Sequence, residues 1–449
     1  MINSPEDPIA ALATPAATSA LAVIRVSGRG SLAILTGLAR SAGPLDGMRG
    51  HTIHRCILRD GEEDVDDVLI AVYRAPRSYT GEEGAEIFCH GSIPVIQRLL
   101  SLLHRSGFRP AGPGEFTQRA FLNGRMDLTR AEAVNEIVRA RTDRARGLAL
   151  QRLSGAIEDR VGSAREALID LRASLEAVID YPEDQIDAGI VDARLRPALA
   201  ILEGLAGTYR HGRVYQEGMS VAIAGATNAG KSSLFNALLR QDRAIVSEFH
   251  GTTRDWLEGT ASIEGIPVKL IDTAGLRASA DPLEAEGMRR THQVMESVDA
   301  VIYLVDAARG VSVGDRGVID GWTGPAPLLR AWNKIDLSAA LPVPDGFIPL
   351  SAMTGAGVDQ IERSIVNAAL GGEPRDDGAP LIDSERQRDL LRRALDALKR
   401  FAAARQKGVT ADLLAVEVAD ALEALGEITG AVTSAEVLDR MFSRFCVGK

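Results

Sequence analysis

A glycine-rich segment between an apolar run and a helix-forming run constrains the fold of this 449-residue chain more than any other feature. Residues 225–232 read Gly-Ala-Thr-Asn-Ala-Gly-Lys-Ser, directly after the apolar residues 221–224 and directly before residues 233–239. In a phosphate-binding loop of this kind, glycines let backbone N–H groups turn towards the phosphates. Lys231 would supply a positive charge to the β- and γ-phosphates, and Ser232 would bind Mg²⁺. Taken alone, the pattern also fits an ordinary glycine turn before a helix.

Two further predicted strands end in guanine-nucleotide motifs. Residues 268–271 predict a strand that ends in Asp-Thr-Ala-Gly at 272–275, which places a carboxylate near Mg²⁺ and a glycine N–H near the γ-phosphate. Residues 328–332 predict another strand, and Asn-Lys-Ile-Asp follows at 333–336. The carboxylate of Asp336 can accept hydrogen bonds from N1–H and the exocyclic amine of guanine, which adenine does not offer. Asp336 therefore predicts GTP rather than ATP.

A fourth motif completes the nucleotide site. Residues 347–350 predict a strand that leads to Ser351 and Ala352, a loop suited to backbone contact with the guanine carbonyl. Four motifs in this order, each at the end of a strand, are specific for a GTPase domain. The residues that these motifs predict to bind GTP are Asn228, Ala229, Gly230, Lys231, Ser232, Ser233, Asp272, Thr273, Ala274, Gly275, Asn333, Lys334, Asp336, Ser351 and Ala352.

The segment that should sense Mg²⁺ and the γ-phosphate departs from the commonest GTPase pattern. Residues 251–255 read Gly-Thr-Thr-Arg-Asp and lie where a Mg²⁺-sensing threonine belongs. Many GTPases place a water-orienting glutamine directly after the Asp-x-x-Gly motif, and this chain has Leu276 there. Because leucine cannot orient water, hydrolysis must use another group, from this chain or from a partner. The acidic candidates nearby are Asp281, Glu284 and Glu286, each of which alone would be an ordinary surface carboxylate.

The residues before the nucleotide region predict a small α+β domain. Residues 22–26 and 68–73 are the clearest strands, and residues 92–104 predict a helix. Residues 107–114 contain two prolines and three glycines and predict a boundary loop. A chain of this length is too long for one hydrophobic core, so several domains are expected.

Helix-forming sequence lies on both sides of the nucleotide region. Two amphipathic blocks, each needing a partner, predict one helical domain interrupted by an inserted Ras-like P-loop GTPase domain. Capping boxes predict helix starts at Thr129, with Glu132, and at Thr433, with Glu436. The apolar stripes contain Leu168, Leu171, Leu175 and Val178 before the insertion, and Leu391, Leu395 and Leu398 after it. The predicted domains are 1–118, 119–215, 216–375 and 376–449, which together make a multidomain protein of α+β and α/β class.

Composition limits the partners. With a net charge of −10, any RNA partner would need a local basic patch. Arg139, Arg141, Arg144 and Arg146 form such a stretch, and a solvated helix face explains them equally well. The three cysteines, Cys56, Cys89 and Cys446, lack metal-binding spacing. The amino-terminal residues do not resemble a secretion signal and no apolar run is long enough to span a bilayer, so we expect a cytoplasmic protein without a membrane partner.

The sequence resembles the MnmE (also called TrmE) family of tRNA-modification GTPases from end to end. The terminal Phe-Cys-Val-Gly-Lys and the Pro-Gly-Glu-Phe run at 113–116 are more specific than the GTPase motifs, which other families share. The matching segments are residues 24–28, 78–82, Glu86, 90–91, 113–116, 119–124, 127–128, 131–133, the Gly-Thr-Thr-Arg-Asp and Asp-Thr-Ala-Gly-Leu-Arg motifs, and 445–449.

The resemblance implies a three-part protein. In this family a small N-terminal domain dimerises and binds a 5-formyl- or 5,10-methylene-tetrahydrofolate as one-carbon donor. With an FAD-containing MnmG protein, in a heterotetramer, the family adds a (carboxymethyl)aminomethyl group to C5 of the wobble uridine of certain tRNAs. GTP hydrolysis is activated when two GTPase domains meet around K⁺. The expected ligands are therefore GTP, Mg²⁺, K⁺ and a folate, and the expected partners are a second copy, an MnmG-like protein and tRNA.

The same resemblance assigns roles to individual residues. Ser232 and Thr253 would bind Mg²⁺, and Glu284 would orient the attacking water through a bridging water. K⁺ would be bound by Asn228, Ser247, Phe249 and Thr252. The GTP-binding loop around it would contain Ser247, Glu248, Phe249, His250, Gly251, Thr252 and Thr253. Folate contacts would fall on Arg25, Glu86, Arg125 and Lys449, with Cys446 close to the folate as a further candidate catalytic residue beside Glu284 and Lys231.

Alternatives remain at this stage. Without the resemblance, Arg25 and Glu86 would be ordinary strand charges, and Cys446 an inert terminal thiol. A GTPase switch in ribosome or RNA assembly would share the GTPase motifs. That function would predict an RNA-binding module such as a KH domain, and we find no Gly-x-x-Gly-centred unit of this kind. The chain also has residues 15–20, Pro-Ala-Ala-Thr-Ser-Ala, where the family usually has a glycine- and arginine-rich stretch.

Overall fold

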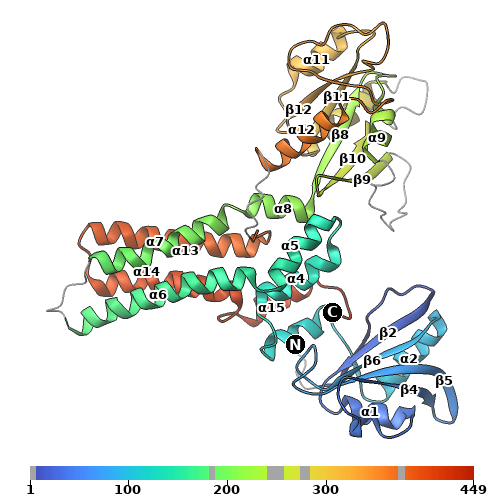
Figure 1. Cartoon of the computed structure of the whole chain (residues 1–449), viewed down its shortest axis with the longest axis vertical. Coiled ribbons are helices and arrows are strands. Elements are labelled where there is room, and N and C mark those ends of the chain that lie inside the picture. The colour runs from blue at the N-terminus through green and yellow to red at the C-terminus, as the bar shows by residue number, and fades with distance from the viewer. Residues whose placement is uncertain (1–6, 182–187, 240–256, 274–283, 373–379) are drawn as a thin grey trace. The chain divides into compact units, whose positions relative to one another are not determined.

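A computed structural model describes residues 7–181, 188–239, 257–273, 284–372 and 380–449 (Figure 1). The chain splits into two compact units. The first contains residues up to Asn135 together with Leu422–Lys449, and the second contains Glu136–Ala421. We describe each unit separately. The combination of an N-terminal α+β sheet, a helical region and an α/β nucleotide region confirms the predicted fold class.

The first unit is built on a seven-stranded sheet with the order β3-β4-β5-β6-β2-β1-β7. The predicted strands 22–26 and 68–73 lie within β2 and β5, and the predicted helix 92–104 corresponds to α2. The strands are β1 (Ile9–Leu12), β2 (Ser19–Ser27), β3 (Ala39–Arg40), β4 (Thr52–Asp60), β5 (Glu63–Tyr73), β6 (Gly84–Gly91) and β7 (Arg109–Pro110). The helices are α1 (Ser31–Leu38), α2 (Ile93–Arg105), α3 (Glu115–Leu122), most of α4 (Leu128–Arg139), the end of α14 (Ala411–Thr429) and α15 (Ala435–Phe442), with a short 3₁₀ turn, η1 (Leu45–Gly47).

Helices α1 and α2 share one core with the sheet. Alternate residues of β2, such as Ile24 and Val26, pack in this core with Leu35 of α1 and Leu99 of α2. The residues between them, including Arg25, therefore point to the other face, because side chains alternate along a strand. At one end of that other face, Ile9 of β1 packs with Phe116 of α3 in a separate small core.

The second unit contains a six-stranded sheet with the order β13-β12-β11-β8-β10-β9, in which only β9 is antiparallel to its neighbour. Its strands are β8 (Met219–Gly225), β9 (Leu257–Ile263), β10 (Ile266–Asp272), β11 (Ala300–Asp306), β12 (Leu328–Asn333) and β13 (Ile348–Leu350). The helices around this sheet are α9 (Lys231–Leu239), α10 (Glu284–Ser297), α11 (Val313–Gly321) and α12 (Val358–Leu370).

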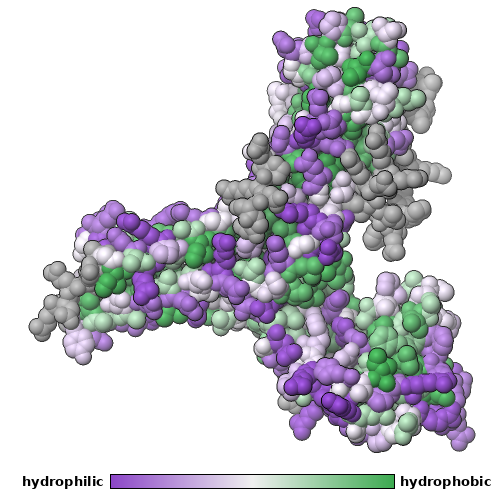
Figure 2. All heavy atoms as spheres, viewed as in Figure 1, coloured by the Kyte–Doolittle hydropathy of each residue, from purple (hydrophilic) through white to green (hydrophobic). Residues whose placement is uncertain are grey.

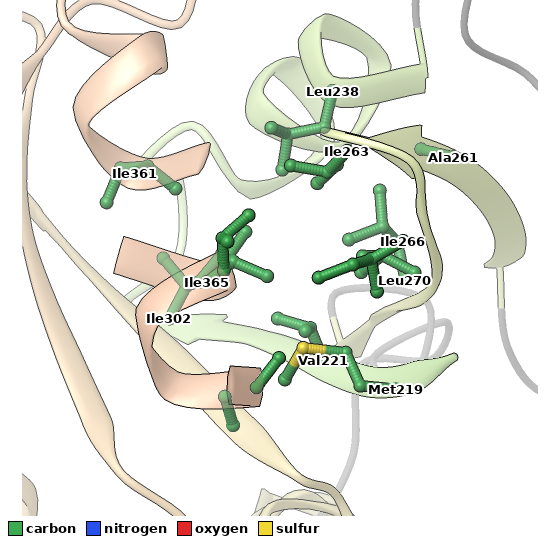
Figure 3. Close-up of a cluster of buried hydrophobic side chains, with 14 of the residues drawn as sticks. Met219, Val221, Leu238, Ala261, Ile263, Ile266, Leu270, Ile302, Ile361 and Ile365 are labelled. Atoms are coloured by element: carbon green, nitrogen blue, oxygen red, sulfur yellow. The ribbon is translucent and has the colours of Figure 1, made fainter. Parts of the chain in front are cut away.

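Helices cover both faces of this sheet. Leu238 of α9 and Ile361 and Ile365 of α12 pack against Val221 and Leu270 on one face (Figure 3). On the other face, Val294 and Met295 of α10 and Ile319 of α11 pack against Val301 and Trp332. Burial on both faces explains why the central strands read as continuous apolar runs. The carboxyl ends of the parallel strands are then the natural place for a ligand.

The remaining helices of the second unit come from both sides of the nucleotide region (Figure 1). They are α5 (Asp143–Leu153), α6 (Ala156–Asp180), α7 (Ala188–Ala206), α8 (Tyr209–Glu217), α13 (Glu385–Gln406) and the first part of α14. The leucines of both predicted stripes are buried, and Val178 is half-buried. In the described residues, no helix is both long and apolar enough to cross a membrane.

Both predicted capping boxes were placed wrongly. Helix α4 begins at Leu128, and a carboxylate oxygen of Asp127 accepts the N–H of Arg130 at 2.8 Å. Asp127 is therefore the N-cap, and the Thr129 hydroxyl donates to its carboxylate. At α15 the N-cap is Ser434, which accepts the N–H of Val437, not Thr433. Aspartate and serine cap helices at least as well as threonine, and Asp127, two residues before Thr129, and Ser434, directly after Thr433, take the N-cap positions.

Candidate functional site

The phosphate-binding loop lies between β8 and α9, as its sequence predicts. Gly225 and Gly230 have left-handed φ values of 141° and 99°. A Cβ atom on Gly225 would collide with the carbonyl oxygen of Leu304, and one on Gly230 with the side-chain nitrogen of Asn333. Both positions therefore require glycine for space as well as for backbone conformation. Asn228 also has a positive φ, 64°.

Lys231 is folded against this loop. Its ammonium donates to the carbonyl oxygens of Gly225 at 3.0 Å and Ala226 at 2.9 Å, and its side chain is almost fully buried. The amine is thereby held at the mouth of the loop, where a phosphate would bind.

Ser232 and Asp272 meet because β8 and β10 are parallel neighbours. The Ser232 hydroxyl donates to the Asp272 carboxylate at 2.8 Å, and Asp272 is fully buried. Hydroxyl and carboxylate oxygens are ligands that Mg²⁺ accepts, and Mg²⁺ is commonly completed by water and phosphate oxygens. Among the described residues, no group of three or more His, Cys, Asp or Glu side chains could hold a metal ion by itself. The hydroxyl of Ser232 and the carboxylate of Asp272 suit a Mg²⁺ ion whose other ligands are phosphate oxygens and water.

Asn333 connects three of the predicted motifs. Its side-chain N–H donates to the carbonyl of Ala229 at 2.7 Å, and its side-chain oxygen accepts the N–H of Ala352 at 3.0 Å. The residue is buried, so each bond is protected from water. Asp336, three residues later, is exposed and available to a base.

One residue of this site was missed by the sequence predictions. Asp306 ends β11, and its carboxylate forms an ion pair with the ammonium of Lys334 at 2.7 Å. Burial raises the pKa of Asp306, but hydrogen bonds from Lys334 and from the N–H of Ala308 outweigh burial and hold the pKa below its ordinary value. An acidic residue at the end of the apolar run 300–305 was the signal that could have indicated it.

Several predicted residues cannot be placed. Those outside the described residues are Ser247, Glu248, Phe249, His250, Gly251, Thr252, Thr253, Ala274 and Gly275, together with Leu276 and Asp281. Glu284 begins α10, but its side chain also lies outside the description, as does that of Glu286.

A second site lies in the first unit, where Arg25 of β2 faces Glu86 of β6. The two residues are direct cross-strand partners, and their side chains form an ion pair at 2.7 Å. The Arg25 guanidinium lies 5.3 Å from the ring centre of Tyr79 and 5.8 Å from that of Phe116. Phe116 is fully buried and Tyr79 is 37% exposed, so the site combines one charged pair with one accessible aromatic ring, which suits a planar ligand carrying polar groups.

The C-terminus returns to this second site. Arg25 donates to the carbonyl of Gly448 at 3.2 Å, across 423 residues of sequence. Gly448 has a φ of 94°, and a Cβ atom there would lie 2.5 Å from the carbonyl oxygen of Leu12. Burial and the nearby Arg25 charge lower the pKa of Lys449. The structure therefore brings Arg25, Glu86 and Lys449 together.

The other two predicted residues of this region are Cys446, which lies near Lys449, and Arg125. Cys446 is exposed, and its carbonyl accepts the N–H of Gly114 at 3.2 Å. The Arg125 side chain lies against Gly81 and forms no hydrogen bond or ion pair with the described residues.

Two arginines of the basic stretch 139–146 contact other side chains of the second unit. Arg144 lies over the ring of Tyr215 at 5.6 Å, and Arg146 pairs with Asp143 at 2.7 Å. Arg141 lines a cavity of about 550 Å³ beside α8. The partners of Arg144 and Arg146 favour a helix face that contributes to packing.

Family models match nearly the whole chain. The model described as "GTP-binding protein TrmE N-terminus" matches residues 8–125. The model described as "MnmE helical domain" matches residues 128–446. A tRNA modification GTPase MnmE from Moorella thermoacetica is 41% identical over 464 residues, covering 99% of this chain and 100% of that protein. Its counterpart from Geotalea uraniireducens is 39% identical over 454 residues, covering 99% of each. The chain, with a complete set of GTPase motifs, therefore belongs to the MnmE family of tRNA modification GTPases.

Proposed function

We propose that this GTPase modifies tRNA at the wobble uridine. With an FAD-containing, MnmG-like partner it would add a (carboxymethyl)aminomethyl group to C5 of that base. The proposal is carried by one observation: likeness to MnmE proteins extends over 99% of the chain. The test is mass spectrometry of tRNA nucleosides from a deletion strain. Loss of the C5-substituted uridine, restored by the gene, supports the proposal. An unchanged profile without a redundant enzyme would favour an assembly switch instead.

The first unit would hold the one-carbon donor, a 5-formyl- or 5,10-methylene-tetrahydrofolate. When bound, a folate of this kind supplies the carbon that becomes attached to C5. The carboxylate of Glu86 can accept from N–H groups of a pterin ring, and Arg25, Arg125 and Lys449 offer positive donors to carbonyl and carboxylate groups. Cys446 would lie close to the folate, because the segment that carries it is anchored beside Arg25.

The second unit would bind GTP with Mg²⁺ and K⁺. Ser232 and Thr253 would bind Mg²⁺, with Lys231 on the phosphates and Asp336 on guanine. K⁺ would be bound by Asn228, Ser247, Phe249 and Thr252, and Glu284 would orient water in place of the absent glutamine. The reaction rate should therefore depend on the cation. Equal rates of GTP hydrolysis in KCl and NaCl at matched ionic strength would contradict K⁺-dependent activation.

We also propose that two copies associate through the first unit. Leu21, Ile53 and Leu69 are 59%, 63% and 47% exposed, and strand pairing places all three on the sheet face opposite α1 and α2. Figure 2 shows hydrophobic residues gathered on the surface of this unit. Exposed apolar surface of this kind marks protein interfaces. Light scattering should give the mass of a dimer, and an Ile53→Lys variant should give a monomer.

A further inference from the structure

Asp306 is fixed in place by its own turn. It is the last residue of β11 and the register partner of Asn333 on β12. One carboxylate oxygen accepts the N–H of Ala308 at 3.0 Å, and the side chain is 10% exposed. The other oxygen is therefore presented in a defined position beside the residue that follows Asn333.

Lys334 occupies that position. Its φ of 71° lies in the left-handed region, which a residue with a side chain adopts only when its surroundings hold it there. The backbone on either side is bonded: the N–H of Ala307 donates to the carbonyl of Asn333 at 2.8 Å, and that of Leu337 donates to the carbonyl of Lys334 at 3.2 Å. The ammonium donates to Asp306 at 2.7 Å. Backbone and side chain of Lys334 are thus both fixed.

We propose that Asp306 is a positioning residue for guanine-nucleotide binding, which acts by holding Lys334 extended beside the base. The inference rests on the proposed guanine contacts of residues 333–336. A lysine stem offers an apolar surface to a flat base while its ammonium is bound elsewhere. A lysine that is already ordered loses less rotamer freedom when the nucleotide binds, so the affinity rises.

The chemistry of the pair supports a constant role at neutral pH. The hydrogen bonds to the Asp306 carboxylate hold its pKa below the ordinary value, so the carboxylate is ionised at neutral pH. Arg309 is the other cation near Asp306, with its Nε 3.9 Å from the carboxylate. The geometry also allows a purely structural role, because the bond to Ala308 alone could shape the turn. The test has to separate these two roles.

A double-mutant cycle separates them. The proteins are the full-length wild type, Asp306→Asn, Lys334→Ala and the double variant, with affinity measured using fluorescent GDP. Asparagine keeps an oxygen acceptor for Ala308 and removes the charge. We expect Asp306→Asn to weaken GDP binding about tenfold, mainly through faster dissociation, the effect of one charge-assisted hydrogen bond. The same change in the Lys334→Ala background should have no further effect. The kcat at saturating GTP should change much less than the affinity.

The control is Asp359→Asn. Asp359 pairs with Arg363 on the exposed side of α12 in the same unit, and its side chain is 58% exposed. This variant should keep wild-type affinity. An equal loss of affinity from Asp306→Asn in both backgrounds would overturn the proposal, since Asp306 would then act through its turn. Unchanged affinity in Asp306→Asn, with weakened binding in Lys334→Ala, would overturn it while leaving the guanine contact intact. Unchanged affinity in Lys334→Ala would overturn both the proposed role of Asp306 and the proposed contact of Lys334 with guanine.

Discussion

The nucleotide site and the Arg25 site are assembled in different ways. The first takes its residues from successive strand ends of one parallel sheet, so each motif reaches the site through its own strand. The second joins β2 and β6, whose residues are 61 positions apart, with a C-terminal segment 423 positions away. Local motifs therefore reveal the first site, whereas the second depends on long-range strand register and on one returning segment. We expect the two sites to fail in different ways when they are altered.

The largest expected effect concerns GTP hydrolysis. Glu284→Ala should keep GTP affinity and lower kcat by about 100-fold or more, because it removes the group proposed to orient water. Glu286→Ala, two residues along the chain, is the matched control and should retain most of its activity. Steady-state GTP hydrolysis in KCl measures both. Full turnover by Glu284→Ala would remove this residue from the mechanism.

The C-terminal segment should be more sensitive than any single side chain of its site. Gly448→Ala places a Cβ against Leu12 and strains a left-handed backbone, so the segment should lose its anchor and the protein should lose most of its folate affinity. Gly61 has a similar φ, 65°, with nothing within 4 Å. Gly61→Ala should therefore cost only about 1 kcal/mol of stability. Equal folate affinity in the two variants would show that the segment is not part of the site.

A substitution in the Arg25–Glu86 pair tests the second site alone. Arg25→Met keeps an unbranched apolar stem and removes the charged guanidinium, and should weaken binding of 5-formyl-tetrahydrofolate by roughly 10- to 100-fold. Arg55→Met is the control, since Arg55 pairs with Asp67 on the same sheet and is 77% exposed. Calorimetric titration gives both affinities. A loss of similar size in the control would mean that the effect is non-specific.

The smallest effect is expected from thiol labelling. Cys446 is exposed, whereas Cys56 and Cys89 are buried, and burial raises the pKa of Cys89 to about 11. Because the thiolate is the reactive form, only Cys446 should react in the native protein, and all three should react after denaturation. Folate should slow labelling of Cys446 several-fold, and GDP should not. Equal effects of the two ligands would contradict the separation of the sites.

Sequence motifs locate a residue best where its position follows from its own strand. Lys231, Ser232 and Asn333 lie at the carboxyl ends of their strands. The carboxyl ends of parallel strands lie at the same edge of the sheet, so the strand that precedes each motif already fixes its position. Asp306 was missed because its ion pair with Lys334 forms only if β11 and β12 are neighbours in the sheet. The sequence of neither strand shows which strand lies beside it. The pairing of Arg25 with Glu86 depends on register in the same way and was not predicted, and the resemblance alone singled out the two residues as folate contacts. The helix caps at Asp127 and Ser434 were misassigned because several residues within one turn compete for the same N–H groups.

The central claim is that both sites serve one reaction on tRNA. The most direct measurement is the content of C5-substituted wobble uridine in a deletion strain that expresses the wild type, Ser232→Ala or Glu86→Gln at equal protein levels. We predict that the wild type restores the modified nucleoside and that each variant fails to do so, although the two changes lie in different units. Restoration by either variant would contradict the claim, because the corresponding site would then be dispensable for the modification.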